Sequence, residues 1–149
     1  MNYKIIGQYI KDLQFNIPNP KTFFLLSKDI ENYKINIDIK SNQIKEKIIE
    51  VETSLNLIPS KENYERISTK ILYSTIIELD EEIKDKKEVE KIVLVKVPAE
   101  IYPELRKIFV FVFENSGFKD IKISRSVDFQ KLYINADDFL ILGPDICPK

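Results

Sequence analysis

Histidine is absent from this 149-residue chain, and cysteine occurs only once, as Cys147. Without histidine the chain has no imidazole general base, no Ser–His or Cys–His pair, and none of the commonest zinc ligand. A single cysteine allows neither an internal disulfide nor a cysteine-based metal site. These absences exclude several classes of enzyme and metalloprotein, and we expect no cofactor.

Glycine and excess charge are also scarce. The three glycines, Gly7, Gly117 and Gly143, are too far apart to form a phosphate-binding loop. The chain has 23 basic and 24 acidic residues, so it lacks the basic surface of a nucleic-acid-binding protein. No apolar run reaches the roughly 20 residues that span a bilayer, and the N-terminus lacks a signal-peptide core. We therefore expect a soluble, cytoplasmic protein with no nucleic-acid partner and no membrane insertion.

The most apolar stretch, PAEIYPELRKIFVFVFENSG, covers residues 98–117. Pro98 suits the first turn of a helix, and Gly117 suits the position just after its end. These signals predict a helix of about five turns. Because the helix is apolar on most faces, we expect it to be buried from several sides, either by the rest of the chain or by other copies.

Four other segments alternate with the period of a β-strand. They cover residues 3–15, 32–40, 44–58 and 64–79, and a turn is predicted at SNQ, residues 41–43. In the first segment, alternation predicts one shared face for Tyr3, Ile5, Tyr9, Leu13 and Phe15. Four consecutive strands with short connections suggest an antiparallel meander with one buried face.

Helices follow the strands. VLVKV, residues 93–97, could extend a strand or form a short helix, and the helix is favoured. Residues 127–133 have helical spacing. The predicted class is α+β: a four-stranded antiparallel meander sheet, then a long helix and a shorter C-terminal helix packed on one face. We expect one domain over residues 1–149, with the last ~12 residues as a loosely held tail.

The segment after the first strand carries four consecutive apolar residues. NIPNPK, with two prolines and two asparagines, predicts a loop, and Phe23, Phe24, Leu25 and Leu26 follow it. These side chains either fold back over the core or form a movable apolar lid.

Four motifs, in order, resemble the SecB family of protein-export chaperones over roughly residues 3–134. YIKDLQFNIPNP (9–20) resembles the end of the family's first strand, and PAEIYPELR (98–106) resembles the start of its long helix. SGFKDIKI (116–123) resembles its G-x-F-P-x-L loop, with Lys119 where proline is usual, and VDFQKLY (127–133) resembles its closing helix.

The resemblance implies a dimer of dimers in which the long helices lie between the sheets. The implied interface residues of this homotetramer are Ile101, Leu105, Ile108, Phe109, Val112 and Phe113. The resemblance also implies a holdase, a chaperone that binds unfolded preprotein clients in an apolar groove. The implied groove residues are Phe23, Phe24, Leu26, Phe118, Phe129, Leu132 and Tyr133.

The resemblance further implies docking of the export motor SecA on an acidic sheet surface. Asp12 matches one acidic docking position, but Asn16 and Ser74 replace two others. Because an opposite-charge contact at such a site contributes about 0.2–1 kcal/mol, these losses are expected to weaken docking. They favour an alternative, a SecB-like chaperone dedicated to one partner such as the antitoxin of a toxin–antitoxin system.

Two further hypotheses belong to other classes. The first is an enzyme with catalytic carboxylates. The candidates are expected to be solvated on a polar strand face or in the tail: Glu50, Glu52, Asp137 and Asp138. A small-ligand-binding module would use the same apolar groove, and a co-purified lipid or detergent would support it.

Overall fold

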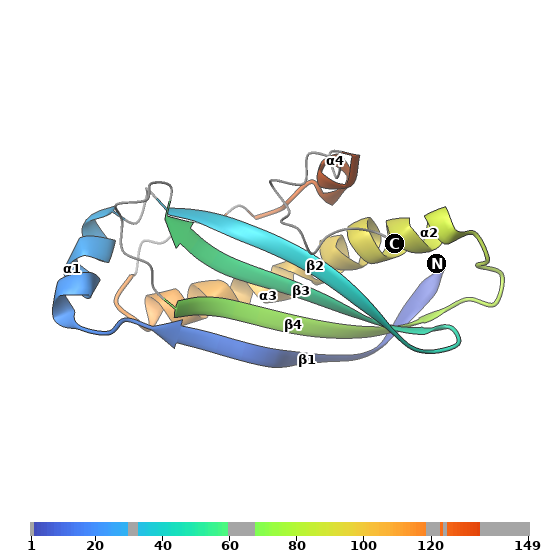
Figure 1. The fold of residues 1–149 in the computed structure, drawn as a ribbon, viewed down its shortest axis with the longest axis horizontal. Helices are drawn as coiled ribbons and strands as arrows, with labels where there is room; N and C mark the ends of the chain where they lie inside the picture. The colour runs from blue at the N-terminus through green and yellow to red at the C-terminus, as the bar shows by residue number, and fades with distance from the viewer. Residues whose placement is uncertain (1, 30–32, 60–67, 119–122, 124, 135–149) are drawn as a thin grey trace.

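The computed structural model describes residues 2–29, 33–59, 68–118, 123 and 125–134. It has a four-stranded antiparallel sheet with one long helical segment along one face and a short helix, α1, across one end (Figure 1). The predicted α+β class is confirmed. No helix among the described residues is long and apolar enough to cross a membrane. The predicted tail, residues 138–149, lies outside the described residues.

The sheet order differs from a four-strand meander. The strands are β1 (Tyr3–Asn16), β2 (Tyr33–Lys45), β3 (Ile48–Pro59) and β4 (Ser68–Leu79), in the order β1-β4-β3-β2. Strands β2, β3 and β4 form a meander, whereas β1 pairs with β4 instead of β2. The connection between β1 and β2 contains α1 (Pro20–Asp29) and is long enough to pass from one edge of the sheet to the other.

The turn between β2 and β3 lies later than predicted. The backbone stays extended through residues 41–43 and turns at Glu46 and Lys47, where Lys47 has a φ of 66°. Two-residue hairpins favour positive φ, which Asn and Gly adopt most readily, and this turn has neither. The sequence therefore gave little local sign of its position.

Two bulges in β1 invert the side-chain alternation of the segment between them. The pairing with β4 skips Ile6 and Lys11, so each is an extra residue in its strand. As a result Tyr9 lies opposite Ser74 and contacts Glu50, on the sheet face away from α3. The prediction that Tyr9 shares a face with Tyr3 is wrong, because a one-residue shift moves a side chain to the other face.

The long helical segment has three parts. α2 (Lys86–Lys91), a π-helical turn η2 (Ile92–Lys96) and α3 (Val97–Glu114) follow one another directly. The N–H of Val97 donates to the carbonyl of Ile92, five residues earlier. This wider turn directly precedes Pro98. In a regular α-helix the ring of a proline would crowd the carbonyl four residues earlier. The helix predicted for residues 93–97 is confirmed.

One face of α3 packs on β3 and β4. Five of its buried residues recur at every fourth position, namely Val97, Ile101, Leu105, Phe109 and Phe113, and Pro98 and Tyr102 are buried beside them. The other face includes an exposed Glu104–Lys107 ion pair and Phe111, whose exposed fraction is 66%. The helix is therefore amphipathic, and its own chain does not bury it from several sides. Burial of the outward face by other copies stays a prediction.

The core has two clusters along the sheet. The first contains Ile92, Val97, Tyr102 and Phe129, so it joins η2, α3 and α4 (Phe129–Ile134) to the sheet. The second lies toward α1 and contains Leu26, Phe109, Phe113 and Phe118 with inward side chains of β3 and β4. Two partly buried residues, Ile5 and Ile37, pack against both clusters.

Candidate functional site

Aromatic side chains meet where α1 approaches the end of α3. The ring centroids of Phe23 and Phe118 are 5.2 Å apart, and those of Phe118 and Phe113 are 5.9 Å apart. Phe15 packs edge-on against Phe113 at 4.9 Å, and Phe24 contacts Phe23 at 5.6 Å. These five residues, the aromatic cluster, run without a break from fully buried Phe113 to Phe24, whose exposed fraction is 69%.

The helix that carries Phe23 and Phe24 begins with a strong cap. The side-chain oxygen of Asn19 accepts a hydrogen bond from the N–H of Thr22 at 2.8 Å, and Pro20 is the first helical residue. Asparagine at the cap followed by proline is a favoured helix start. The predicted loop at Phe23–Leu26 is therefore wrong. The Asn19–Pro20 pair was the signal that could have revealed the helix.

The two faces of α1 differ in exposure. Thr22 and Leu26, four residues apart, are buried, and Leu26 belongs to the second core cluster. Phe24 and Leu25 are exposed. An anchored helix therefore presents two large apolar side chains to solvent.

The segment after α3 is tied to the same region. The Nε of Arg106 donates to the carbonyl of Ile123 at 3.2 Å, and Ile123 packs against the second core cluster. The P-x-x-I-Y-P-x-x-R motif contains Arg106, but the motif did not reveal this structural role. The bond holds Ile123 against α3.

The structure separates the predicted groove residues. Phe23 is half-buried and Phe24 exposed, whereas Leu26, Phe118 and Phe129 are buried in the core. Phe129 lies in the first core cluster and Leu26 and Phe118 in the second, so the structure does not bring all three together. These three side chains have almost no free surface in the single chain, and their role in a groove stays a prediction. The side chains of Leu132 and Tyr133 lie outside the described residues.

Most of the predicted interface residues are also internal. Ile101, Leu105, Phe109 and Phe113 have exposed fractions of 0–1% because their own sheet covers them. Ile108 and Val112 are half-buried, and the interface stays a prediction for all six residues. Exposed apolar side chains occur instead at Phe111 and along the edge strand β1, at Ile6, Ile10 and Leu13.

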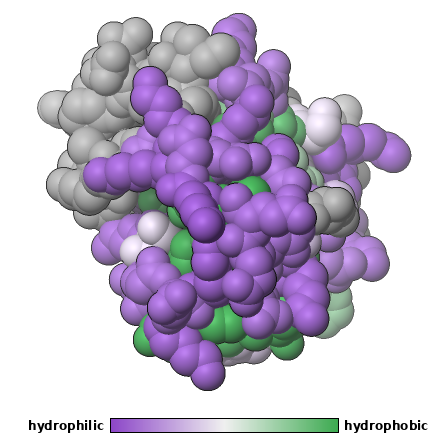
Figure 2. Space-filling view, turned by 90° about the vertical axis from the view of Figure 1, so that its right-hand side faces the viewer, coloured by the Kyte–Doolittle hydropathy of each residue, from purple (hydrophilic) through white to green (hydrophobic). Residues whose placement is uncertain are grey.

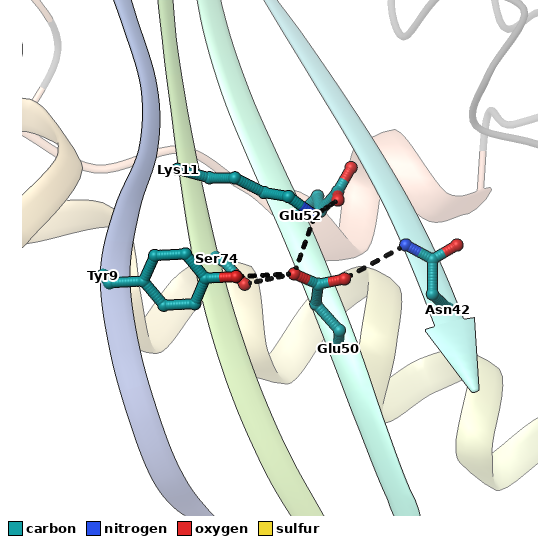
Figure 3. Close-up of polar contacts among 6 residues, drawn as sticks. All are labelled: Tyr9, Lys11, Asn42, Glu50, Glu52 and Ser74. Atoms are coloured by element: carbon teal, nitrogen blue, oxygen red, sulfur yellow. Dashed lines mark hydrogen bonds and ion pairs between the residues drawn. The ribbon is translucent and has the colours of Figure 1, made fainter. Parts of the chain in front are cut away.

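The outer face of the sheet holds an ion pair around Glu50 (Figure 3). The Glu50 carboxylate accepts from the Ser74 hydroxyl at 2.6 Å, from Lys11 Nζ at 3.0 Å and from Asn42 at 3.2 Å. Lys11 also donates to Glu52. Lys11 lies on the same face as Tyr9, two residues earlier, and its long side chain crosses β4 to reach β3.

These contacts change the titration of Glu50. The hydrogen bond from Ser74, followed by those from Lys11 and Asn42, lowers the pKa of Glu50 to about 2 against an opposing effect of burial. The hydrogen bond to Glu52, followed by that to Glu50, raises the pKa of Lys11. Glu50 is thus ionised and neutralised by a neighbour at neutral pH, which suits a structural role.

The described residues offer little for catalysis. They contain no group of three potential metal ligands of the His, Cys, Asp or Glu type. Glu50 and Glu52 both pair with Lys11, and Asp137 and Asp138 lie outside the described residues. Asp12, the predicted docking carboxylate, accepts a hydrogen bond from Gln14 at 2.8 Å.

Comparison with known proteins identifies the family. The family model described as preprotein translocase subunit SecB matches residues 1–138. The chain belongs to the SecB family. It is 42% identical over 132 residues to a putative protein-export protein SecB of Pelagibacter ubique, covering 89% of this chain and 94% of the relative. It is 28% identical to the protein-export protein SecB of Anaplasma phagocytophilum, covering 87% and 89%.

A solved structure shares the fold. The SecB-like chaperone of Mycobacterium tuberculosis, in complex with a ChAD peptide from the HigA1 antitoxin, matches with a TM-score of 0.59 at 10% identity. The match covers 83% of this chain and 90% of that one. SecB proteins are preprotein-export chaperones that bind unfolded polypeptides and are not enzymes, so the predicted family and function are confirmed.

Proposed function

We propose that this SecB chain holds unfolded preproteins on the apolar surface at the α1 end of the sheet. The observation that carries the proposal is the exposure of Phe24, next to exposed Leu25, on a helix anchored by buried residues. Aromatic side chains offer large contact area with few rotatable bonds, which suits binding to varied extended segments. The peptide complex of the M. tuberculosis chaperone supports the proposal, since a similar fold there holds a polypeptide.

The holdase activity can be measured by light scattering of a denatured client. At a stoichiometric ratio the purified protein is expected to suppress client aggregation without any nucleotide. The proposal fails if several unrelated clients aggregate at the same rate with and without the protein.

Replacing Phe24 with alanine is expected to weaken client-peptide binding by about tenfold. Full burial of a phenylalanine side chain contributes about 1.5–3 kcal/mol, and about 1.4 kcal/mol corresponds to a tenfold change in Kd. Because Phe24 is exposed in the free protein, the free energy of unfolding should change by only about 0.5 kcal/mol or less. Fluorescence titration with a labelled client peptide measures the Kd.

A matched control is Ile44→Ala. Ile44 is also exposed, at 52%, but lies at the β2–β3 hairpin. The end of the molecule with α2 and this hairpin presents mainly hydrophilic side chains (Figure 2). Equal losses of affinity in Phe24→Ala and Ile44→Ala would argue against a binding surface at α1.

The chain is also proposed to act as a homotetramer, a dimer of dimers, in the cytoplasm. Among the described strands, β1 pairs only with β4, and its exposed apolar side chains include Ile6, Ile10 and Leu13. An edge strand is a ready site for pairing with another chain. On α3, exposed Phe111 and half-buried Ile108 and Val112 supply a second apolar surface.

Phe111→Lys is expected to reduce the mass of the assembly in solution while the chain stays folded. Phe111 is exposed in one chain, so a charge there disturbs only a contact between copies. Multi-angle light scattering gives the mass, and circular dichroism checks the fold. Ile44→Lys is the control and should leave the mass unchanged. A wild-type monomer would refute the tetramer.

SecA is proposed to dock weakly on the outer sheet face. Asp12 supplies one carboxylate there, whereas Ser74 uses its hydroxyl to bind Glu50, which Lys11 neutralises. Because Lys11 offsets one of the two charges of Glu50 and Glu52, it reduces the negative charge that attracts a basic partner. Calorimetric titration with the basic tail of SecA measures the affinity, and nanomolar binding would be inconsistent with this proposal.

A chaperone dedicated to one antitoxin is the second candidate function. The M. tuberculosis chaperone of similar fold was solved with an antitoxin peptide, and the loss of acidic docking positions fits a role outside general export. A toxin–antitoxin pair in the neighbouring genes, with an antitoxin that binds this chain, would support it. Binding of many unrelated preproteins with similar Kd values would count against it.

A further inference from the structure

Gly117 closes α3 with a backbone conformation that few residues adopt. Its φ is 99°, in the left-handed region. The N–H of Phe118 donates to the carbonyl of Phe113 at 3.0 Å, and that of Gly117 donates to Glu114 at 3.4 Å. This pair of bonds is the Schellman motif, and the contact between the rings of Phe118 and Phe113 is its usual apolar companion.

The missing side chain of Gly117 also leaves room for α1. A Cβ atom at this position would lie 2.8 and 2.9 Å from two ring carbons of Phe23. Heavy atoms do not approach so closely without displacement, so any side chain at residue 117 would push the Phe23 ring away. Gly117 therefore serves two purposes, the helix end and the close approach of Phe23.

Phe23 connects this contact to the proposed client surface. Its ring touches Phe118 on one side and Phe24 on the other. Because Phe23, Phe24 and Leu25 are consecutive residues of one helix, the packing of the Phe23 ring is one of the contacts that set where the two exposed side chains point, together with buried Leu26.

We propose that Gly117 is a positioning residue for client binding, which acts through Phe23 to hold α1 and its exposed Phe24 and Leu25 in place. The client part of this inference rests on the proposed function. The position of α1 does not depend on that function and can be measured without a client.

The test separates the helix end from the Phe23 contact. Asparagine adopts the left-handed conformation more easily than other residues with a side chain, so Gly117→Asn keeps the helix end but adds a Cβ against Phe23. Amide hydrogen exchange of Leu25 and Leu26 should then rise about tenfold, while exchange in β3 and β4 stays unchanged. The Kd for a client peptide should rise about five- to tenfold, by analogy with loss of a positioned aromatic anchor.

The decisive comparison is a double-mutant cycle with Phe23→Ala. Once the ring is removed, Gly117→Asn should add less than about twofold to exchange in α1, because coupled residues act non-additively. Additive effects on α1 exchange, or no effect of Gly117→Asn alone, would overturn the proposal. Gly7→Asn is the control glycine, since a Cβ there would meet Ile76 at an ordinary 3.7 Å.

Amide exchange in α1 and client binding together show whether the holdase proposal or the role of Gly117 is wrong. If α1 exchange shows the coupling but the wild type binds no client, the holdase proposal fails and the role of Gly117 in positioning α1 stands. If clients bind equally well to wild type and Gly117→Asn while α1 exchange is unchanged, the role of Gly117 fails and the holdase proposal stands.

Discussion

Replacing Phe109 with alanine is expected to lower the free energy of unfolding by about 3–5 kcal/mol. Phe109 is fully buried, and its ring stacks on Phe113 at a centroid distance of 4.4 Å. The substitution leaves a cavity between α3 and the sheet that close-packed neighbours fill only in part. A loss of this size is a large share of the roughly 5–15 kcal/mol that stabilises a typical protein. Urea unfolding at fixed protein concentration measures it.

Phe111→Ala is the matched control, because it makes the same change on the same helix two residues away. Phe111 is largely exposed, so the expected change in the free energy of unfolding is about 0.5 kcal/mol or less. The pair of variants also tests the assignment of α3 residues to the core or to an interface. Similar losses in both variants would mean that the outward face of α3 is as important to chain stability as the inward face.

Replacing Glu50 with alanine is expected to cost about 1–3 kcal/mol of unfolding free energy. The substitution leaves the buried Ser74 hydroxyl without its acceptor and removes one of the two carboxylates that contact Lys11. Glu52→Ala is the comparison, and a smaller loss is expected because the only contact found for its carboxylate among the described residues is Lys11. A larger loss in Glu52→Ala than in Glu50→Ala would contradict the central role given to Glu50.

The same carboxylate predicts how stability depends on pH. Because the pKa of Glu50 in the folded protein, about 2, lies below its ordinary value of 4.5, its contribution is fully present above about pH 4.5. The contribution is lost as the pH falls from there toward 2. Wild-type stability should therefore fall more steeply across this range than that of Glu50→Gln. Parallel curves from unfolding at several pH values would rule this out.

Several predictions succeeded because they depend on local spacing. The alternation of β3 and β4 follows directly from the period of an extended chain, and the apolar repeat of α3 follows from the period of a helix. The four motifs then indicated the family, which the comparisons confirm.

The predictions that failed depended on single residues or on contacts across the chain. The helix α1 was missed because Asn19 and Pro20, which also favour turns, act here as a helix cap. Tyr9 was placed on the wrong face because two bulges, at Ile6 and Lys11, interrupt an alternation that looks regular in sequence. The first bulge has a local sign, since Gly7 follows Ile6 and a glycine inside a strand suggests a bulge, whereas the second, at Lys11, has none.

The sequence by itself determined the α+β class, the apolar faces of the strands and the long helix, and the family. Only the tertiary structure decided what covers each apolar face. It assigned Phe109 and Phe113 to the chain's own core, left Phe24 and Phe111 exposed, and brought Phe23 to Gly117. The physical reason is that periodicity records which side chains avoid water, whereas the partner that excludes the water comes from segments far apart in the chain.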